Sequence, residues 1–259
     1  MTKKELVRSV LSTSAESFLP GVSVDCVIFG FHEGTLKILL NKFSYYIKWM
    51  TPGGFVLKDE NVDDAAYRIL HNRTGLENIY LRQYYLFGDS NRTDMTENED
   101  MLIRQGYTDP DERKNHWLVQ RYVSVGYYAL VEYSKVKIET NADEEIGWFG
   151  LDEIPALYSD HNHIVDKALS SIKIQLHNLP IGYELLPEKF TMTELRSIYE
   201  TILGQKLDRR NFQRKMLSTG YIHKLEETSK KFGVKSSTLF SFDKEKYEKA
   251  MESGLVFFE

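Results

Sequence analysis

Residues 54–76 read GFVLKDENVDDAAYRILHNRTGL, and this stretch decides the fold. It overlaps a Pro-Gly-Gly run at residues 52–54, which interrupts regular structure. Apolar residues then recur at the spacing of one face of an α-helix: Ala65, Ala66, Ile69 and Leu70. Gly75 is a natural C-terminal cap for such a helix. The stretch therefore predicts a loop that leads into a helix with one buried face.

Short apolar runs on both sides of this helix predict β-strands at residues 22–31, 36–41, 45–49, 79–87, 118–132 and 146–149. The turn at residues 32–35 joins the first two strands as a hairpin, and the Pro-Gly-Gly run ends the third. Helical spacing predicts two more helices, at residues 2–17 and 161–176, and Pro20-Gly21 separates the earlier one from the first strand. Cys26 lies in an apolar run, so we expect a buried structural thiol and no nucleophile.

Residues 89–114 form a long polar segment between two predicted strands. Loops of this length in compact domains are usually functional or mobile, so we expect a surface excursion here. His161 and His163 lie two apart at the start of a predicted helix, without a third ligand nearby. We therefore expect a helix cap and a surface residue at these positions, and no metal site.

The 259 residues suit two domains of ordinary size. No apolar run approaches the roughly 18 residues that span a bilayer, and the N-terminus lacks the apolar core of a secretion signal. We expect a cytoplasmic protein that does not bind membranes. Residues 187–259 carry 14 Lys and Arg against 11 Asp and Glu, whereas residues 1–186 carry 19 against 27. The basic excess of the second part suits a polyanionic partner, and the acidic first part does not.

The second part has the spacing of a helix-turn-helix. Thr191 and Glu194 form a capping-box pattern at the start of one helix, and Asp208 caps a second helix at residues 209–218. Two strand patterns follow, at residues 221–225 and 238–242, with a polar loop between them. A basic hairpin after a helix-turn-helix is typical of a winged helix, which serves either DNA binding or protein interaction.

The stretch that opens this section resembles the Nudix box, G-x5-E-x7-R-E-U-x-E-E-x-G-U, where U is aliphatic. The matching residues are Gly54, Glu60, Arg68, Leu70, Gly75 and Leu76. Together with residues 87–89, 123–130, 148–161 and 207–215, the box resembles the Nudix-related transcriptional regulators of bacteria, and among them the arabinose-utilisation regulators of gut Bacteroidetes. The resemblance implies an α+β protein: a Nudix-type α/β/α sandwich with a mixed sheet at residues 1–180, followed by a winged helix-turn-helix at residues 181–259.

The box departs from the pattern of active Nudix enzymes. Where those enzymes place metal-binding carboxylates, this chain has Ile69, Asn72 and Arg73. A hard divalent cation needs several carboxylate oxygens, and a cation at residue 73 would repel it. We therefore expect no catalytic residues, no metal and no cofactor. We expect Glu60 to serve as a solvated or helix N-terminal carboxylate. The alternative is an active hydrolase of nucleoside diphosphate compounds such as ADP-ribose or nucleotide sugars.

The resemblance implies that the second helix of the winged helix enters the major groove of an operator. We expect its polar side chains to contact bases or the backbone nearby: Arg209, Arg210, Asn211, Gln213, Arg214 and Lys215. The predicted wing would hold phosphates through Lys230, Lys231 and Lys235. A single module offers limited affinity, so we expect a homodimer on a palindromic double-stranded operator, with the N-terminal helix or the sensor sheet as its interface.

Effectors of these regulators range from ADP-ribose-like nucleotides to sugars, and the degenerate box favours a neutral sugar. Sugar sites combine an aromatic platform with polar partners. On strands and loops that would border the cleft, the candidates are Asp25, Tyr45, Lys48, Trp49, Asp89, Trp117 and Arg121. We predict a repressor of arabinose-utilisation genes that L-arabinose releases from its operator.

Overall fold

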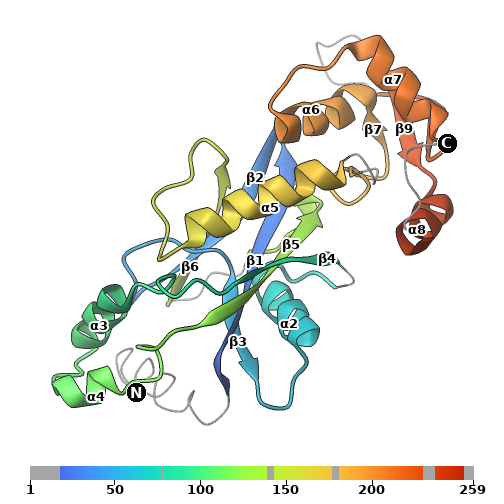
Figure 1. Ribbon diagram of the computed structural model, residues 1–259. Coiled ribbons are helices and arrows are strands. Elements are labelled where there is room, and N and C mark those ends of the chain that lie inside the picture. The colour runs from blue at the N-terminus through green and yellow to red at the C-terminus, as the bar shows by residue number, and fades with distance from the viewer. Residues whose placement is uncertain (1–17, 78, 139–142, 177–180, 230–236, 254–259) are drawn as a thin grey trace. The chain divides into compact units, whose positions relative to one another are not determined.

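The computed structural model describes residues 18–77, 79–138, 143–176, 181–229 and 237–253 (Figure 1). The chain divides into two compact units. The first comprises residues up to Ile28, Ile38–Ala129 and Val136–Ala168, and the second comprises Phe29–Lys37, Leu130–Lys135 and the chain from Leu169 onward. The predicted helix at residues 2–17 lies outside the described residues. The division between 180 and 181 expected from the sequence stays a proposal.

Residues 18–150 contribute the strands of a six-stranded sheet. Its strands are β1 (Phe18–His32), β2 (Thr35–Phe43), β3 (Gly53–Leu57), β4 (Tyr80–Phe87), β5 (Val123–Val131) and β6 (Glu144–Gly150). The order is β4-β5-β1-β2-β6, and β3 pairs antiparallel with β1. The centre of the sheet is apolar, with Val24, Ile28 and Ala129 fully buried.

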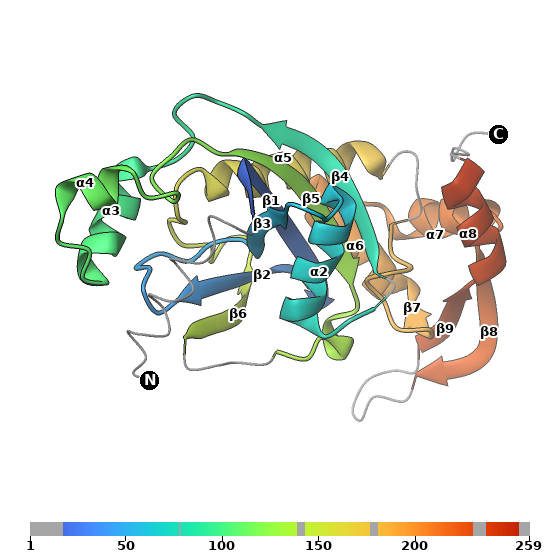
Figure 2. The ribbon, with the colours of Figure 1, turned by 90° about the horizontal axis from the view of Figure 1, so that it is seen from below.

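Helices α2 (Val62–Thr74) and α5 (His161–Gln175) cover opposite faces of this sheet (Figures 1 and 2). Ile69 of α2 lies directly over Gly54 of β3, and the Tyr84 hydroxyl of β4 donates to the Ile164 carbonyl of α5 at 2.8 Å. Gly75 caps α2 in the left-handed conformation. The predicted α/β/α sandwich and its box helix are confirmed.

The hairpin of β1 and β2 turns at Glu33 and Gly34, both at positive φ, which matches the right-handed twist of paired strands. Strand β1 starts four residues earlier than the sequence pattern indicated. It runs through Pro20 and Gly21 because β3 pairs with it, and the register shifts between Phe18 and Ser23. Gly21 has a φ of 73°, which favours glycine at that irregularity.

The sequence expectations for residues 45–54 are wrong. Residues 45–49 form no strand; they lie in a loop whose tyrosine rings pack together, with a single bridge from Met50 to Asn41. The Pro-Gly-Gly run does not end a strand there, since Gly53 and Gly54 begin β3.

The segment 89–114 is a largely exposed excursion between β4 and β5, as expected, but it is helical where a loop was expected. It contains α3 (Met95–Arg104) and the short α4 (Pro110–Lys114), whose N-termini are capped by Asp94 and Asp109. Four residues of this region form their own buried cluster: Met101, Leu102, Tyr107 and Leu118. The polar residues of the segment therefore cover a small hydrophobic core of its own.

The second unit contains α6 (Met192–Leu203) and α7 (Arg209–Ser218), followed by a hairpin of β8 (Ile222–Ser229) and β9 (Ser237–Phe242). The predicted capping box is present: the Thr191 hydroxyl accepts from the Glu194 backbone, and the Glu194 carboxylate accepts from the Thr191 backbone at 2.7 Å. The sequence did not predict β7 (Phe190–Thr191), which pairs with β9, the 3-10 turn at Tyr133–Lys135, or α8 (Lys244–Ser253).

No helix within the described residues is long and apolar enough to cross a membrane.

Candidate functional site

A cavity of about 330 Å³ opens in the first unit, beside the box helix. Aromatic rings dominate its walls: Phe18, Phe43, Tyr45, Tyr46, Phe55, Trp117, Tyr122 and Tyr158. Several of these rings contact one another, as Phe55 does with Trp117 at 4.7 Å between ring centroids. Walls of this kind bind flat apolar faces and leave specificity to a few polar groups.

The polar end of the cavity is built around Asp25, which is 6% exposed. Its carboxylate accepts from the Ser124 hydroxyl and lies 3.5 Å from the Arg92 guanidinium. Arg92 in turn donates two bonds to Asp160, each 2.9 Å long. Because Gly53 pairs opposite Asp25, a β-carbon there would lie 2.5 Å from the Asp25 carboxylate. Glycine at this position therefore makes room for the buried carboxylate.

His161 completes the polar end and is buried, which corrects the expectation of a helix cap and surface residue. Its Nδ1 accepts from the Thr51 backbone at 3.1 Å, so the neutral ring carries its hydrogen on Nε2. That nitrogen lies 3.8 Å from the Asp25 carboxylate. Burial lowers the pKa of His161, which keeps the ring neutral. His163 is exposed, as expected.

The surviving residues of the box have structural partners. The Glu60 carboxylate receives two bonds from Arg68, of 2.6 and 2.8 Å, and one from the Leu57 backbone. Arg68 also donates to the Phe55 carbonyl at 3.0 Å. Glu60 therefore ties the loop to α2, which corrects its expected role as a solvated or helix N-terminal carboxylate.

The three residues at which the box departs from the Nudix pattern all line the cavity: Ile69, Asn72 and Arg73. Arg73 lies 3.0 Å from the buried Glu144 carboxylate. Within the described part of the chain, no group of three or more His, Cys, Asp or Glu side chains could hold a metal ion.

Replacing Glu60 by glutamine is expected to lower the free energy of unfolding by about 1–3 kcal/mol at pH 7, because a charge-assisted pair becomes a neutral one. The hydrogen bonds from Arg68 hold the pKa of Glu60 below its ordinary value of 4.5. The stabilisation is therefore complete above about pH 4.5 and is lost as the pH falls through the folded-state pKa. Urea unfolding followed by tryptophan fluorescence reports on the first unit alone, since Trp49, Trp117 and Trp148 all lie there.

In that measurement the difference in the free energy of unfolding between wild type and Glu60→Gln should become smaller as the pH falls from 7 to 3.5. Glu77→Gln, at an exposed position, is the control and should show no such trend. A difference in the free energy of unfolding that is the same at every pH would contradict this role of Glu60.

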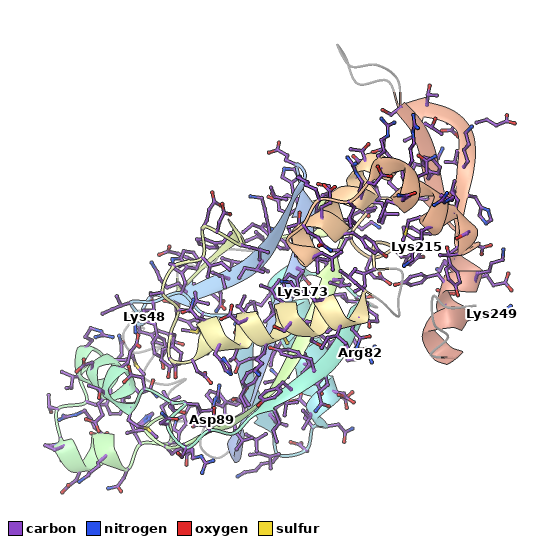
Figure 3. All side chains as sticks on the ribbon, turned by 45° about the horizontal axis from the view of Figure 1, so that its top comes forward. Lys48, Arg82, Asp89, Lys173, Lys215 and Lys249 are labelled. Atoms are coloured by element: carbon purple, nitrogen blue, oxygen red, sulfur yellow. The ribbon has the colours of Figure 1, made fainter. Side chains whose placement is uncertain are left out.

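Three of the seven predicted effector residues line the cavity, namely Asp25, Tyr45 and Trp117. The other four are not among its lining residues. Lys48 pairs with Glu97 of α3 at 3.0 Å, and Asp89 is exposed after β4; both are labelled in Figure 3. Trp49 packs edge-on against Phe149, and Arg121 donates to the Gly88 carbonyl. The polar lining residues that sequence reasoning missed include Arg92, Asn98, Asp160 and His161. For Asn98, the pattern Asp94 to Glu97 was a usable signal of a helix start.

In the second unit, the candidate DNA-binding residues lie on α7. Phe212 and Met216 are buried, whereas Arg209, Arg210, Asn211, Arg214 and Lys215 are exposed and Gln213 is partly exposed. The Asp208 carboxylate caps α7, and the Asn211 amide oxygen accepts from Arg214 at 2.9 Å. Lys230, Lys231 and Lys235 lie outside the described residues.

A mixed sheet between helices, followed by two helices and a β-hairpin, defines a class of two-domain proteins: a Nudix domain with a C-terminal winged helix. Residues 19–168 match the model of the NUDIX domain, so the chain belongs to the Nudix domain family. Residues 182–242 match the model of the NrtR DNA-binding winged helix domain.

Similar proteins share both parts. The ADPR responsive transcriptional repressor NtrR of Acinetobacter baylyi is 29% identical over 236 residues, which cover 88% of this chain and 84% of that protein. Shewanella oneidensis NrtR in complex with a 27mer DNA has a TM-score of 0.68 at 21% identity, covering 92% of this chain and 98% of that one. A MutT/nudix family protein from Enterococcus faecalis has a TM-score of 0.61 at 20% identity, covering 94% and 100%. The two structural likenesses concern the fold.

Proposed function

We propose that this chain is a DNA-binding transcriptional repressor whose Nudix domain binds a small effector. The observation that carries the proposal is α7, which buries Phe212 and Met216 and exposes three arginines on its other face. In helix-turn-helix proteins the second helix enters the major groove, where arginine reads guanine. The Acinetobacter relative is named a transcriptional repressor, and the Shewanella neighbour was solved with DNA.

Replacing Arg210 by alanine is expected to cost about 1–3 kcal/mol of operator binding, because a bidentate contact to a base would be lost. The measurement is fluorescence anisotropy with a site selected from random DNA by the full chain, over a range of salt concentrations. Lys231→Ala, at a proposed phosphate contact, should instead weaken all sequences alike and lower the salt slope by about one unit. An Arg210→Ala loss that is equal on selected and random DNA would contradict base reading.

The oligomeric state is part of the proposal. One winged helix makes few base contacts, so a homodimer on a palindromic operator would supply the affinity, and selected sites should show two inverted half-sites. We propose the domain boundary near residues 180 and 181, between the two regions that the family models match.

The charges in the cavity favour a neutral effector. Each arginine that lines it has a carboxylate partner within 3.0 Å: Arg68 with Glu60, Arg73 with Glu144, and Arg92 with Asp160. Each guanidinium charge is therefore already balanced by a carboxylate, which weakens its attraction for a diphosphate, whereas a neutral sugar does not depend on that attraction. The aromatic walls and the Asp25 carboxylate suit a sugar ring and its hydroxyl groups.

L-arabinose is the sugar we propose first, on the resemblance to the arabinose-utilisation regulators. ADP-ribose is the second candidate effector, because the Acinetobacter relative is named as responsive to ADPR. Thermal-shift titration of the full chain with L-arabinose, other pentoses and hexoses, and ADP-ribose separates the two, since a ligand of the folded state raises the melting temperature with its concentration.

We propose that the chain does not hydrolyse nucleoside diphosphate compounds. The carboxylates that would bind a divalent cation are replaced at Ile69, Asn72 and Arg73, and Glu60 is bound by Arg68. Incubation with Mg²⁺ or Mn²⁺ and ADP-ribose, dinucleotides or nucleotide sugars should give no turnover above background. Turnover that Glu60→Gln abolishes, and that the control Glu77→Gln leaves intact, would contradict this proposal and show that the chain is a hydrolase.

A further inference from the structure

The segment 93–118, which carries α3 and α4, forms one wall of the cavity. Four of its residues are lining residues: Thr93, Asn98, Trp117 and Leu118. Behind them lies the hydrophobic cluster around Met101 and Leu102, which gives this wall a core of its own. The segment therefore shapes the volume in which the effector would bind.

Two loops on the other side of the cavity hold this wall in place. From the loop after β2, the Lys48 ammonium pairs with Glu97 at 3.0 Å. From the loop before α5, the Ser159 hydroxyl accepts from the Asp94 backbone at 3.1 Å. Asn98 bonds to both loops: its Oδ1 accepts from the Tyr46 hydroxyl at 3.0 Å and from the Tyr158 hydroxyl at 2.7 Å.

Asn98 is 2% exposed, and its amide nitrogen donates to the Leu118 carbonyl at 2.9 Å. This bond sets the orientation of the amide, so that its oxygen faces the two tyrosines. The two hydroxyl groups also bond to each other, so their two hydrogens are used within this group of three side chains. Burial raises the pKa of Tyr46 and of Tyr158, so both hydroxyls stay protonated.

A tyrosine oxygen that has given its hydrogen away can only accept further hydrogen bonds. Tyr46 and Tyr158 both line the cavity, as does the Asp25 carboxylate, which is also an acceptor. A ligand that fits these groups must bring hydrogen-bond donors. Sugar hydroxyl groups are donors, whereas phosphate oxygens are acceptors.

We propose that Asn98 is a specificity-determining residue of the effector cavity: it fixes the Tyr46 and Tyr158 oxygens as acceptors and so favours ligands that present hydroxyl groups to them over ligands that present phosphate oxygens there. The proposal rests on the proposed function, in which this cavity binds the effector. The segment 93–118 would then determine which class of effector the cavity binds.

The test is a chemical double-mutant cycle with L-arabinose and its monodeoxy analogues, measured by calorimetry on the full chain. In wild type, removal of at least one sugar hydroxyl should weaken binding by about tenfold, the effect of a lost hydrogen bond of about 1.4 kcal/mol. In Tyr46→Phe or Tyr158→Phe, which keep the ring and lose the oxygen, L-arabinose and that deoxy analogue should bind with nearly equal affinity. Asn98→Leu should also make the two affinities nearly equal, and Tyr85→Phe, at an exposed tyrosine, should leave the wild-type difference unchanged.

The outcomes separate the two proposals. If wild type binds L-arabinose, but the penalty for every missing hydroxyl is the same in the three cavity variants, Asn98 does not set specificity and the proposed function stands. Wild type that binds ADP-ribose and none of L-arabinose, D-xylose or D-galactose would contradict both the neutral effector and the selection by Asn98. Because Asn98→Leu removes buried hydrogen bonds and could unfold the wall, the two phenylalanine variants decide the result on their own.

Discussion

Replacing Arg92 by methionine is expected to lower the free energy of unfolding of the Nudix domain by about 3–5 kcal/mol. The Arg92 side chain is 6% exposed and lies between two carboxylates, with two bonds to Asp160 and a 3.5 Å approach to Asp25. Removing it leaves the buried Asp25 carboxylate and the partly buried Asp160 carboxylate without their cation, which costs far more than losing a surface ion pair.

The measurement for Arg92→Met is urea unfolding followed by tryptophan fluorescence at pH 7. Arg92→Lys should recover only part of the loss, because an ammonium group cannot make the paired bonds to Asp160. Arg104→Met, at an exposed arginine of α3, is the matched control and should change the free energy by less than about 0.5 kcal/mol. A loss below about 1 kcal/mol for Arg92→Met would mean that this charge cluster does not organise the cavity.

Saturating L-arabinose is expected to weaken operator binding by about 5- to 150-fold, which corresponds to a coupling free energy of about 1–3 kcal/mol. Binding is reciprocal, so the operator must weaken sugar binding by the same factor. Calorimetric titration of the sugar into free protein and into the protein–operator complex measures that factor directly. Equal sugar affinity in the two titrations would contradict an inducer role, since a ligand with equal affinity for two states does not shift the equilibrium between them.

The parts of the fold that were predicted correctly are those set by local sequence. The box helix follows from the spacing of Ala65 to Leu70 with Gly75 behind it, and α6 from the capping box at Thr191. Both signals lie within a few residues of the element they define, so tertiary contacts did not override them.

The errors arose where distant contacts decide. The aromatic run at residues 45–49 has the composition of a strand, yet Tyr46 turns its hydroxyl to Asn98, 52 residues later. The segment 89–114 is polar overall, and its buried pair Met101 and Leu102 is too short a run to predict a packed helix. Arg92 is held in the cavity by a hydrogen bond to Asp160, which lies 68 residues away in the sequence. No local sequence pattern predicts such a pairing.

The inducer role of the sugar is tested most directly by titration of the selected operator with the full chain, by fluorescence anisotropy at fixed salt, without and with saturating L-arabinose. We expect the sugar to raise the operator Kd by about 5- to 150-fold and to leave the weaker binding of random DNA unchanged. An operator Kd that does not change while the sugar demonstrably saturates the cavity would contradict the inducer role.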